Sequence, residues 1–134
     1  MTPLIFYMEE KTMFELEING VMYQFNFGMG FLREINKKLA VPIDGLSGVK
    51  KNIGLQYFVA SAFDGDVEAL CEILDAANKA QNPRVTRAAL DAYIDDESTD
   101  IDALFNNVFD FLKSANATKK VVAPLLPKVE EAAQ

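Results

Sequence analysis

The side chains that most often carry out catalysis are scarce in this chain. The 134 residues include no histidine and a single cysteine, Cys71. Without histidine, His-based acid–base catalysis, Ser–His and Cys–His nucleophile pairs and most zinc sites are excluded. Cys71 falls on the apolar side of a predicted helix, so we interpret it as a small buried hydrophobic residue. We therefore predict no catalytic residue, and a lone cysteine rules out an internal disulfide.

The chain fits neither a phosphate-binding pattern nor a metal-binding pattern. Gly28-Met29-Gly30 lacks the third glycine and the signature of a nucleotide-binding loop. An EF-hand loop starting at Asp95 would need Gly at its sixth position and Glu at its twelfth, where the chain has Asp100 and Asn106. We predict no cofactor and no metal, and interpret the acids around residues 95–102 as a solvated turn that caps a helix. A small enzyme that uses carboxylates alone is the remaining catalytic alternative.

The acidic residues are concentrated in one part of the chain. The net charge is −7, and between Ala88 and Leu112 there are seven acids and no Lys or Arg. No part of the chain has the basic excess that binding to a phosphate backbone requires, so nucleic acid is not an expected partner. No apolar run approaches the roughly 20 residues that span a bilayer, so we expect no membrane insertion.

Residues 14–27 predict a β-hairpin. Apolar residues alternate with polar ones on both sides of Asn19-Gly20, a pair typical of a type I′ turn. A two-residue turn there pairs Ile18 with Val21, Leu16 with Tyr23 and Phe14 with Phe25, which places every apolar side chain on one face. A lone hairpin is marginal in water, so helices must cover this face.

Helical spacing of apolar residues then predicts about five helices, which cover residues 31–39, 53–63, 67–77, 86–94 and 99–112. The second of these is apolar nearly all round, so we expect it to be central and buried. Asp66 and Thr86 are predicted N-caps, and Ser98 or Thr99 is expected to start the last helix. Residues 40–52 contain Pro42, Gly45 and Gly48 and are expected to form a mobile loop. The fold class is α+β, with an N-terminal β-hairpin packed against the helices in a single domain.

We divide the chain into an extension at residues 1–12, a domain at residues 13–120 and a C-terminal tail at residues 121–134. The extension either adds a strand to the hairpin edge or precedes a natural translation start at Met13. The open hairpin edge also leaves self-association as an alternative.

Five residues are candidates for binding a partner. Val121, Val122, Leu125 and Leu126 form a short apolar face in the tail, which either packs back on the domain or orders when a partner binds. Met22 is the fifth, because it is an apolar residue on the polar face of the hairpin, opposite Glu17.

The chain resembles a known family in several stretches that occur in the same order and at similar spacing. They are Phe14-Glu-Leu-Glu-Ile-Asn-Gly, the stretch from Tyr23 to Glu34 with Phe25, Phe27, Gly28 and Gly30, Ala92-Tyr-Ile-Asp-Asp, and Phe109 to Lys120. Together they resemble the tail assembly chaperones of long-tailed phages and prophages of Gram-positive bacteria over roughly Met13 to Lys120. Residues 1–12 lie outside the resemblance.

The resemblance implies a function without catalysis. Such chaperones bind the long helical tape measure protein in the host bacterial cytoplasm during tail assembly, and are absent from the finished virion. Many of their genes make a longer second product by programmed ribosomal frameshifting, and the extension is thought to contact the tape measure or tail tube protein. The alternative is a structural phage adaptor or tail component that remains in the virion.

Overall fold

The computed structural model describes residues 13–126, and the two strands that open this part of the chain form the predicted hairpin. β1 (Met13–Ile18) pairs with β2 (Val21–Asn26) in the expected register, with Ile18 opposite Val21 and Phe14 opposite Phe25. Asn19 and Gly20 have φ values of 53° and 78°, as a type I′ turn requires. The prediction of the hairpin and its register is therefore confirmed. The alternatives for residues 1–12 lie outside the described residues.

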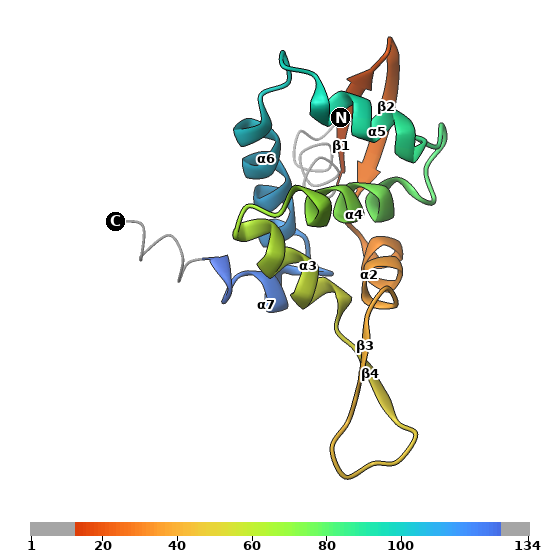
Figure 1. The fold of residues 1–134 in the computed structure, drawn as a ribbon, viewed down its shortest axis with the longest axis vertical. Helices are drawn as coiled ribbons and strands as arrows, with labels where there is room; N and C mark the ends of the chain where they lie inside the picture. Colours follow the sequence, from red (N-terminus) through yellow and green to blue (C-terminus); the bar gives the residue numbers. More distant parts are fainter. Residues whose placement is uncertain (1–12, 127–134) are drawn as a thin grey trace, which may run out of the picture.

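Six helices occur within residues 13–126, and five of them have eight or more residues (Figure 1). They are α2 (Met29–Asn36), α3 (Gly54–Phe63), α4 (Val67–Asn78), α5 (Arg87–Asp95), α6 (Ile101–Ser114) and the short α7 (Lys119–Val122). Together with the hairpin they form one α+β domain, as the alternation of apolar residues predicted.

The core is centred on α4 rather than on α3. α4 packs against α2, α3, α5 and β2, and its buried residues include Leu70, Ile73 and Leu74. The expectation that α3 is the buried central helix is wrong, because Tyr57 on its outer side is 50% exposed. Its nearly continuous apolar sequence reflects small and aromatic residues at the surface, which the hydrophobic pattern alone does not separate from core positions.

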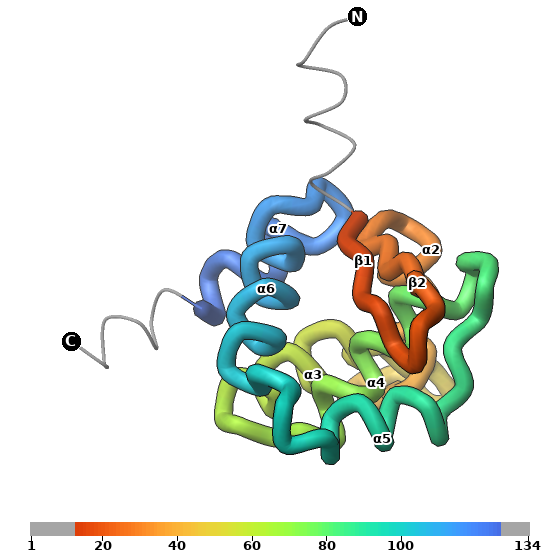
Figure 2. Tube along the Cα trace, turned by 90° about the horizontal axis from the view of Figure 1, so that it is seen from above, coloured from red at the N-terminus to blue at the C-terminus, as the bar shows by residue number. Residues whose placement is uncertain are grey.

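The β-hairpin and α6 are joined by aromatic side chains. Seen from above, α6 and α7 lie on one side of the molecule and the hairpin and α2 on the other (Figure 2). Phe14 bridges them, since its ring centroid lies 5.4 Å from that of Phe25 and 5.2 Å from that of Phe111. The apolar face of the hairpin is thus covered, as its marginal stability in isolation demands.

Residues 40–52 do not form the expected loop. They form an arm in which β3 (Ala40–Pro42) pairs with β4 (Lys50–Asn52), and Val41 lies opposite Lys51. The prediction of a loop is wrong for β3 and β4, and Gly45 and Gly48, which suggested irregular chain, supply the positive φ values (81° and 77°) of the tip between them. The arm projects from the body of the molecule (Figure 1).

Side-chain caps start three of the helices, α4, α5 and α6. Asp66 accepts a hydrogen bond from the backbone N–H of Ala69, and Thr86 accepts one from Ala89, so both predicted N-caps are confirmed. α6 begins later than expected. Its cap is Asp100, which accepts from the N–H of Ala103 at 3.0 Å, rather than Ser98 or Thr99. An aspartate at this position also places negative charge against the positive end of the helix dipole.

Candidate binding groove

A groove of about 980 Å³ lies between the end of α3 and the outer side of α6. We call it the aromatic groove. Its lining residues come from α3, the turn after it, the start of α4, α6 and the last described residue of the chain. They are Ala62, Phe63, Gly65, Val67, Ile101, Asp102, Phe105, Asn106, Phe109, Asp110, Lys113 and Leu126.

The groove exists because the apolar stripe of α6 is wider than the core needs. One row of the stripe, formed by Leu104, Val108 and Leu112, is at most 3% exposed. A second row, formed by Ile101, Phe105 and Phe109 at helical spacing, is only half-buried and lines the groove. The first row packs α6 onto the domain, and the second leaves an apolar helix face partly open to solvent.

The aromatic rings of the groove pack on one another. The ring centroid of Phe109 lies 5.1 Å from that of Phe63 on α3, with 29° between the planes, and 6.0 Å from that of Phe105. Stacked rings have fixed positions, so this surface is largely formed before anything binds to it. Such a surface suits apolar side chains.

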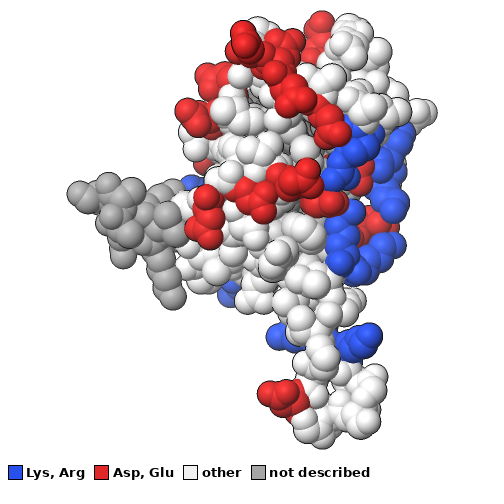
Figure 3. Space-filling view, viewed as in Figure 1, with Lys and Arg blue, Asp and Glu red and all other residues white. Residues whose placement is uncertain are grey.

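Acidic side chains border the groove. Asp102 and Asp110 of α6 are exposed, and Asp110 lies 3.7 Å from Lys113. Asp64, Asp66 and Glu68 are exposed at the turn into α4, beside the lining residues of that turn. Figure 3 shows acidic residues over α5, α6 and the start of α4, whereas Lys and Arg gather over α2 and the end of α4. The groove therefore combines an apolar floor with a border on which acids outnumber the one basic lining residue, Lys113.

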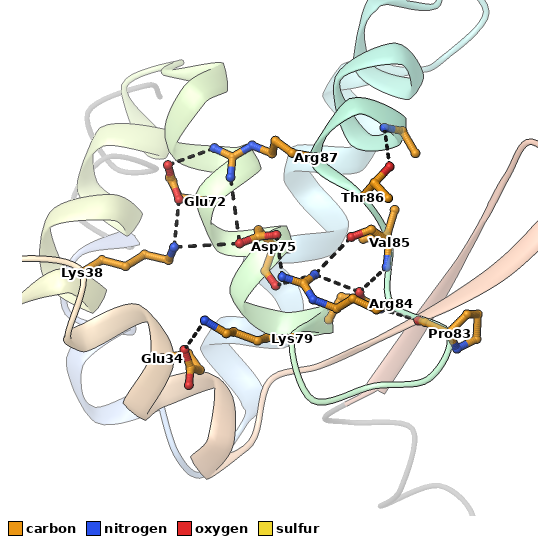
Figure 4. Close-up of polar contacts among 12 residues, drawn as sticks. Glu34, Lys38, Glu72, Asp75, Lys79, Pro83, Arg84, Val85, Thr86 and Arg87 are labelled. Carbon is orange, nitrogen blue, oxygen red and sulfur yellow. Dashed lines mark hydrogen bonds and ion pairs between the residues drawn. The ribbon is translucent and has the colours of Figure 1, made fainter.

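Most of the basic side chains on the other side of α4 are engaged in ion pairs that join α2, α4 and the start of α5 (Figure 4). None of these residues lines the groove. The pairs are Lys79 with Glu34 (3.2 Å), Lys38 with Glu72 (3.0 Å), Arg87 with Glu72 (2.9 Å) and Arg84 with Asp75 (3.0 Å). These lysines and arginines therefore pair with acids of the same domain and are not free cations for a ligand.

The buried side-chain amide of Asn78 also joins separate elements of the domain. Asn78, at the end of α4, is fully buried, and its side chain donates hydrogen bonds to the carbonyl oxygens of Gln24 (2.9 Å) and Pro83 (3.2 Å). Its own oxygen accepts from the N–H of Val85 at 2.6 Å and from Arg84 at 3.1 Å. Asn78 thus links β2 to the chain before α5 with its polar atoms satisfied.

The thiol and the acidic side chains of the described residues show few features of a reactive or metal-binding site. Cys71 is buried, as predicted, and burial raises the pKa of its thiol to about 11. Hydrogen bonds from the backbone N–H and the hydroxyl of Ser98 hold the pKa of Asp96 below its ordinary value. Among residues 13–126, no three Asp, Glu or Cys side chains are arranged to hold a metal ion. The acidic turn is thus organised around its own backbone.

The five predicted partner residues lie in different environments. Val122 and Leu126 are at most 1% exposed and Leu125 is half-buried, so these tail residues pack on the domain. Val121 (38% exposed) and Met22 (48% exposed) face solvent. The only one of the five that lines the groove is Leu126.

Sequence reasoning did not find the groove, because the spacing predicted a single inward face for α6, made of Ile101, Leu104, Phe105, Val108, Phe109 and Leu112. The available signal was the width of the stripe: Ile101, Phe105 and Phe109 form a complete row of their own at intervals of four residues. Phe63 gave no such signal, since only the tertiary structure brings the end of α3 beside this row.

Comparison with known proteins agrees with this picture of a binding protein. No helix among the described residues has the length and hydrophobicity to cross a membrane. No curated protein and no solved structure matches the chain significantly. A family model described as phage tail assembly chaperone protein, TAC, matches residues 15–125 and thus includes the hairpin from Glu15 on, the arm and all residues that line the groove except Leu126. The chain therefore belongs to the phage tail assembly chaperone family, which supports a chaperone role in tail assembly.

Proposed function

We propose that this protein binds the tape measure protein during tail assembly in the host bacterial cytoplasm, and that the aromatic groove receives one of its helical segments. Family membership supports a partner among the tail proteins. The observation that carries the proposal is the half-buried row Ile101, Phe105 and Phe109, a preformed apolar surface on a chain whose role is to chaperone another protein.

The groove suits an amphipathic helix with basic flanks. Helix-in-groove recognition places apolar side chains spaced three or four residues apart into an apolar cleft. Here the acids Asp102 and Asp110 border that cleft and would face Lys or Arg on the flanks of the bound helix. Exposed charges give modest affinity and a fast encounter, which suits a chaperone that must later release its client.

Two further surfaces are proposed as secondary contacts. Met22 on β2 and Val121 on α7 are exposed apolar residues outside the groove. Leu125 and Leu126 would contribute where the tail meets the groove, whereas Val122 would act by holding α7 in place. The tail tube protein is the second candidate partner.

The experiment is a titration of fluorescently labelled segments of the tape measure protein from the same phage or prophage into the full chain, followed by anisotropy. Phe105→Asp places a charge in the floor of the groove, and we expect binding to weaken by about 30-fold, the size of a hot-spot loss. Tyr57→Asp, on the exposed side of α3, is the matched control and should bind as the parent does.

Charge reversal provides a variant that leaves the floor intact. Asp102→Lys combined with Asp110→Lys alters only exposed side chains and should weaken binding of basic-flanked segments most at low salt. Equal binding by the parent, the Phe105→Asp variant and the charge-reversed variant would exclude the groove as the client site. If no segment binds the parent, the tape measure protein is not the client.

Two observations in the native system separate a chaperone from a structural adaptor. Mass spectrometry of purified virions should find this chain missing if it is a chaperone, and present if it is a retained adaptor or tail component. Intact-mass analysis of the gene expressed with its downstream DNA should find a minor, longer product with the same N-terminus if the gene uses programmed frameshifting.

A further inference from the structure

The aromatic groove leaves apolar side chains of α6 partly open to solvent. Its row Ile101, Phe105 and Phe109 is only half-buried, and the lining continues along the helix as far as Lys113. The rise of the helix from Ile101 to Lys113 is about 18 Å, which is the length of about five extended residues. A short apolar segment is therefore enough to fill this surface.

The sequence before the hairpin contains such a segment. Leu4-Ile-Phe-Tyr-Met8 is the longest unbroken run of apolar residues in the chain. Large apolar side chains in a row are costly to leave in water, so this run favours an apolar surface that covers it. Residues 1–8 contain no Asp, Glu, Lys or Arg, and the charged residues Glu9, Glu10 and Lys11 follow the run. The acids at the border of the groove therefore do not repel it.

The described chain begins beside α6, within reach of the groove. The ring centroid of Phe14 on β1 lies 5.2 Å from that of Phe111 near the end of α6 (Figure 2). Phe111 and the groove residue Phe109 are two positions apart, so they lie on nearly opposite sides of a helix that is about 10–12 Å across. Residues 1–12 reach up to about 40 Å when extended. They are therefore long enough to pass around α6 and place the apolar run in the groove.

We propose that residues 4–8 occupy the aromatic groove of their own molecule, and that a client must displace them before it binds. Because residues 9–12 connect the run to β1, its effective concentration at the groove is on the order of millimolar. A contact that is weak in itself therefore closes the groove for most of the time and still yields to a client of higher affinity. The inference rests on the groove of the proposed function and adds its regulation. A product that starts at Met13 lacks the run, so its groove is always open.

Paramagnetic broadening in NMR spectra of the full chain tests the contact without any client. A nitroxide attached to a Thr2→Cys variant broadens the amide signals of residues close to it. Cys71 is buried and the pKa of its thiol is about 11, so a reagent used at neutral pH labels position 2 alone. If the run lies in the groove, the amide signals of Phe105 and Phe109 should lose most of their intensity.

Two further variants of the labelled chain separate a specific contact from mere closeness. Phe6→Asp places a charge in the middle of the apolar run and should restore the groove signals. Lys11→Asp is the matched control, because it introduces the same side chain outside the run and should leave the groove signals weak. The loss of signal should be equal at every protein concentration, since both partners belong to one molecule, and equal at low and high salt, since the run is uncharged.

Groove signals at full intensity in the labelled chain would overturn the proposal. So would a loss of intensity that Phe6→Asp leaves in place or that fades on dilution. A loss confined to the signals of β1 would overturn it as well, because the run would then pair with the edge of the hairpin.

The client titration measures the consequence of closure. If the groove is open in about one molecule in ten, Phe6→Asp should tighten binding of a tape measure segment about tenfold. Lys11→Asp should bind as the parent does. Equal affinities of the parent and Phe6→Asp would show that the run and the client do not compete. The NMR measurement contains no client, so a failure of client binding leaves it unaffected, and an open groove in the parent leaves the proposed function intact.

Discussion

Gly54 is a residue at which no side chain fits. A Cβ atom built there overlaps the carbonyl oxygen of Ile35, so α3 starts in direct contact with the backbone of α2. The N–H of Leu55 donates to the side-chain oxygen of Asn36 at 2.9 Å and holds the two helices at this distance. Gly54→Ala forces the backbones apart, and we expect the free energy of unfolding to fall by about 1–3 kcal/mol in urea denaturation.

Gly30 is the matched control for this substitution, because a Cβ built there meets nothing within 4 Å. Gly30→Ala lies near the start of α2, where alanine is the better helix former, and should raise the free energy of unfolding by up to about 1 kcal/mol. Opposite signs for the two substitutions would establish that close packing, rather than glycine itself, is required at position 54. Equal effects would contradict the clash.

The sequence predicted some of these single-residue features and not others. Asp66 and Thr86 were predicted as caps because each precedes an apolar helical pattern. Asp100 was missed as a cap because Ser98 and Thr99 compete with it for the same role. The need for glycine at position 54 had no local signal, since its cause is the backbone of a helix 19 residues earlier.

At the scale of elements, periodicity predicted which helices exist but not how deeply each is buried. α3 and α4 are both strongly apolar, yet α4 packs against α2, α3, α5 and β2 and buries most of its residues, whereas Tyr57 of α3 is 50% exposed. The arm shows the same limit in another form. Pro42, Gly45 and Gly48 are typical of irregular chain, and only the pairing of β3 with β4 makes them a hairpin.

The junction of α4 with α2 and α5 gives stability that depends on pH. Burial of the Glu72 carboxyl raises its pKa, but hydrogen bonds from Arg87 and Lys38 outweigh burial and leave the pKa below 4.5. Since the pKa is lower in the folded state, this contribution is present above pH 4.5 and is lost as the pH falls through the folded pKa. Glu72→Gln should therefore destabilise the protein at pH 7 by about 0.5–1 kcal/mol, since the pairs are partly exposed.

Urea denaturation of the parent and Glu72→Gln between pH 7 and pH 3 measures this difference. We expect the gap in the free energy of unfolding to narrow as the pH falls below 4.5. Glu97→Gln, in the exposed turn before α6, is the control and should differ from the parent by less than about 0.5 kcal/mol at either pH. A gap that stays constant with pH would indicate that packing of the Glu72 side chain, rather than its charge, stabilises the junction.

For the whole molecule, the two ends of the described chain meet in one core. Phe25 and Phe27 near the start, and Val122 and Leu126 near the end, belong to the same buried cluster as the residues of α4. The sequence left two readings of the tail, because an apolar face of four residues does not reveal what it packs against. Contacts of α7 with α3 and α6 resolve where Val122 and Leu126 lie.

Because the buried residues form one core, a destabilising substitution in the tail should also make α4 open more often. Leu126→Ala removes a side chain that is 1% exposed and should lower the free energy of unfolding by about 2–5 kcal/mol, whereas Val121→Ala, on an exposed side chain, should change it by less than about 0.5 kcal/mol.

Cys71 reports the opening of α4, because burial and a pKa of about 11 keep its thiol unreactive in the folded state. If the domain opens as a unit, Leu126→Ala should speed labelling of Cys71 by a thiol reagent at pH 8 by about 30-fold or more, matching the loss in free energy. An unchanged labelling rate beside a lowered urea midpoint would mean that α4 opens independently of the tail. The core would then consist of separate units, and binding at the groove would leave the hairpin side of the molecule unaffected.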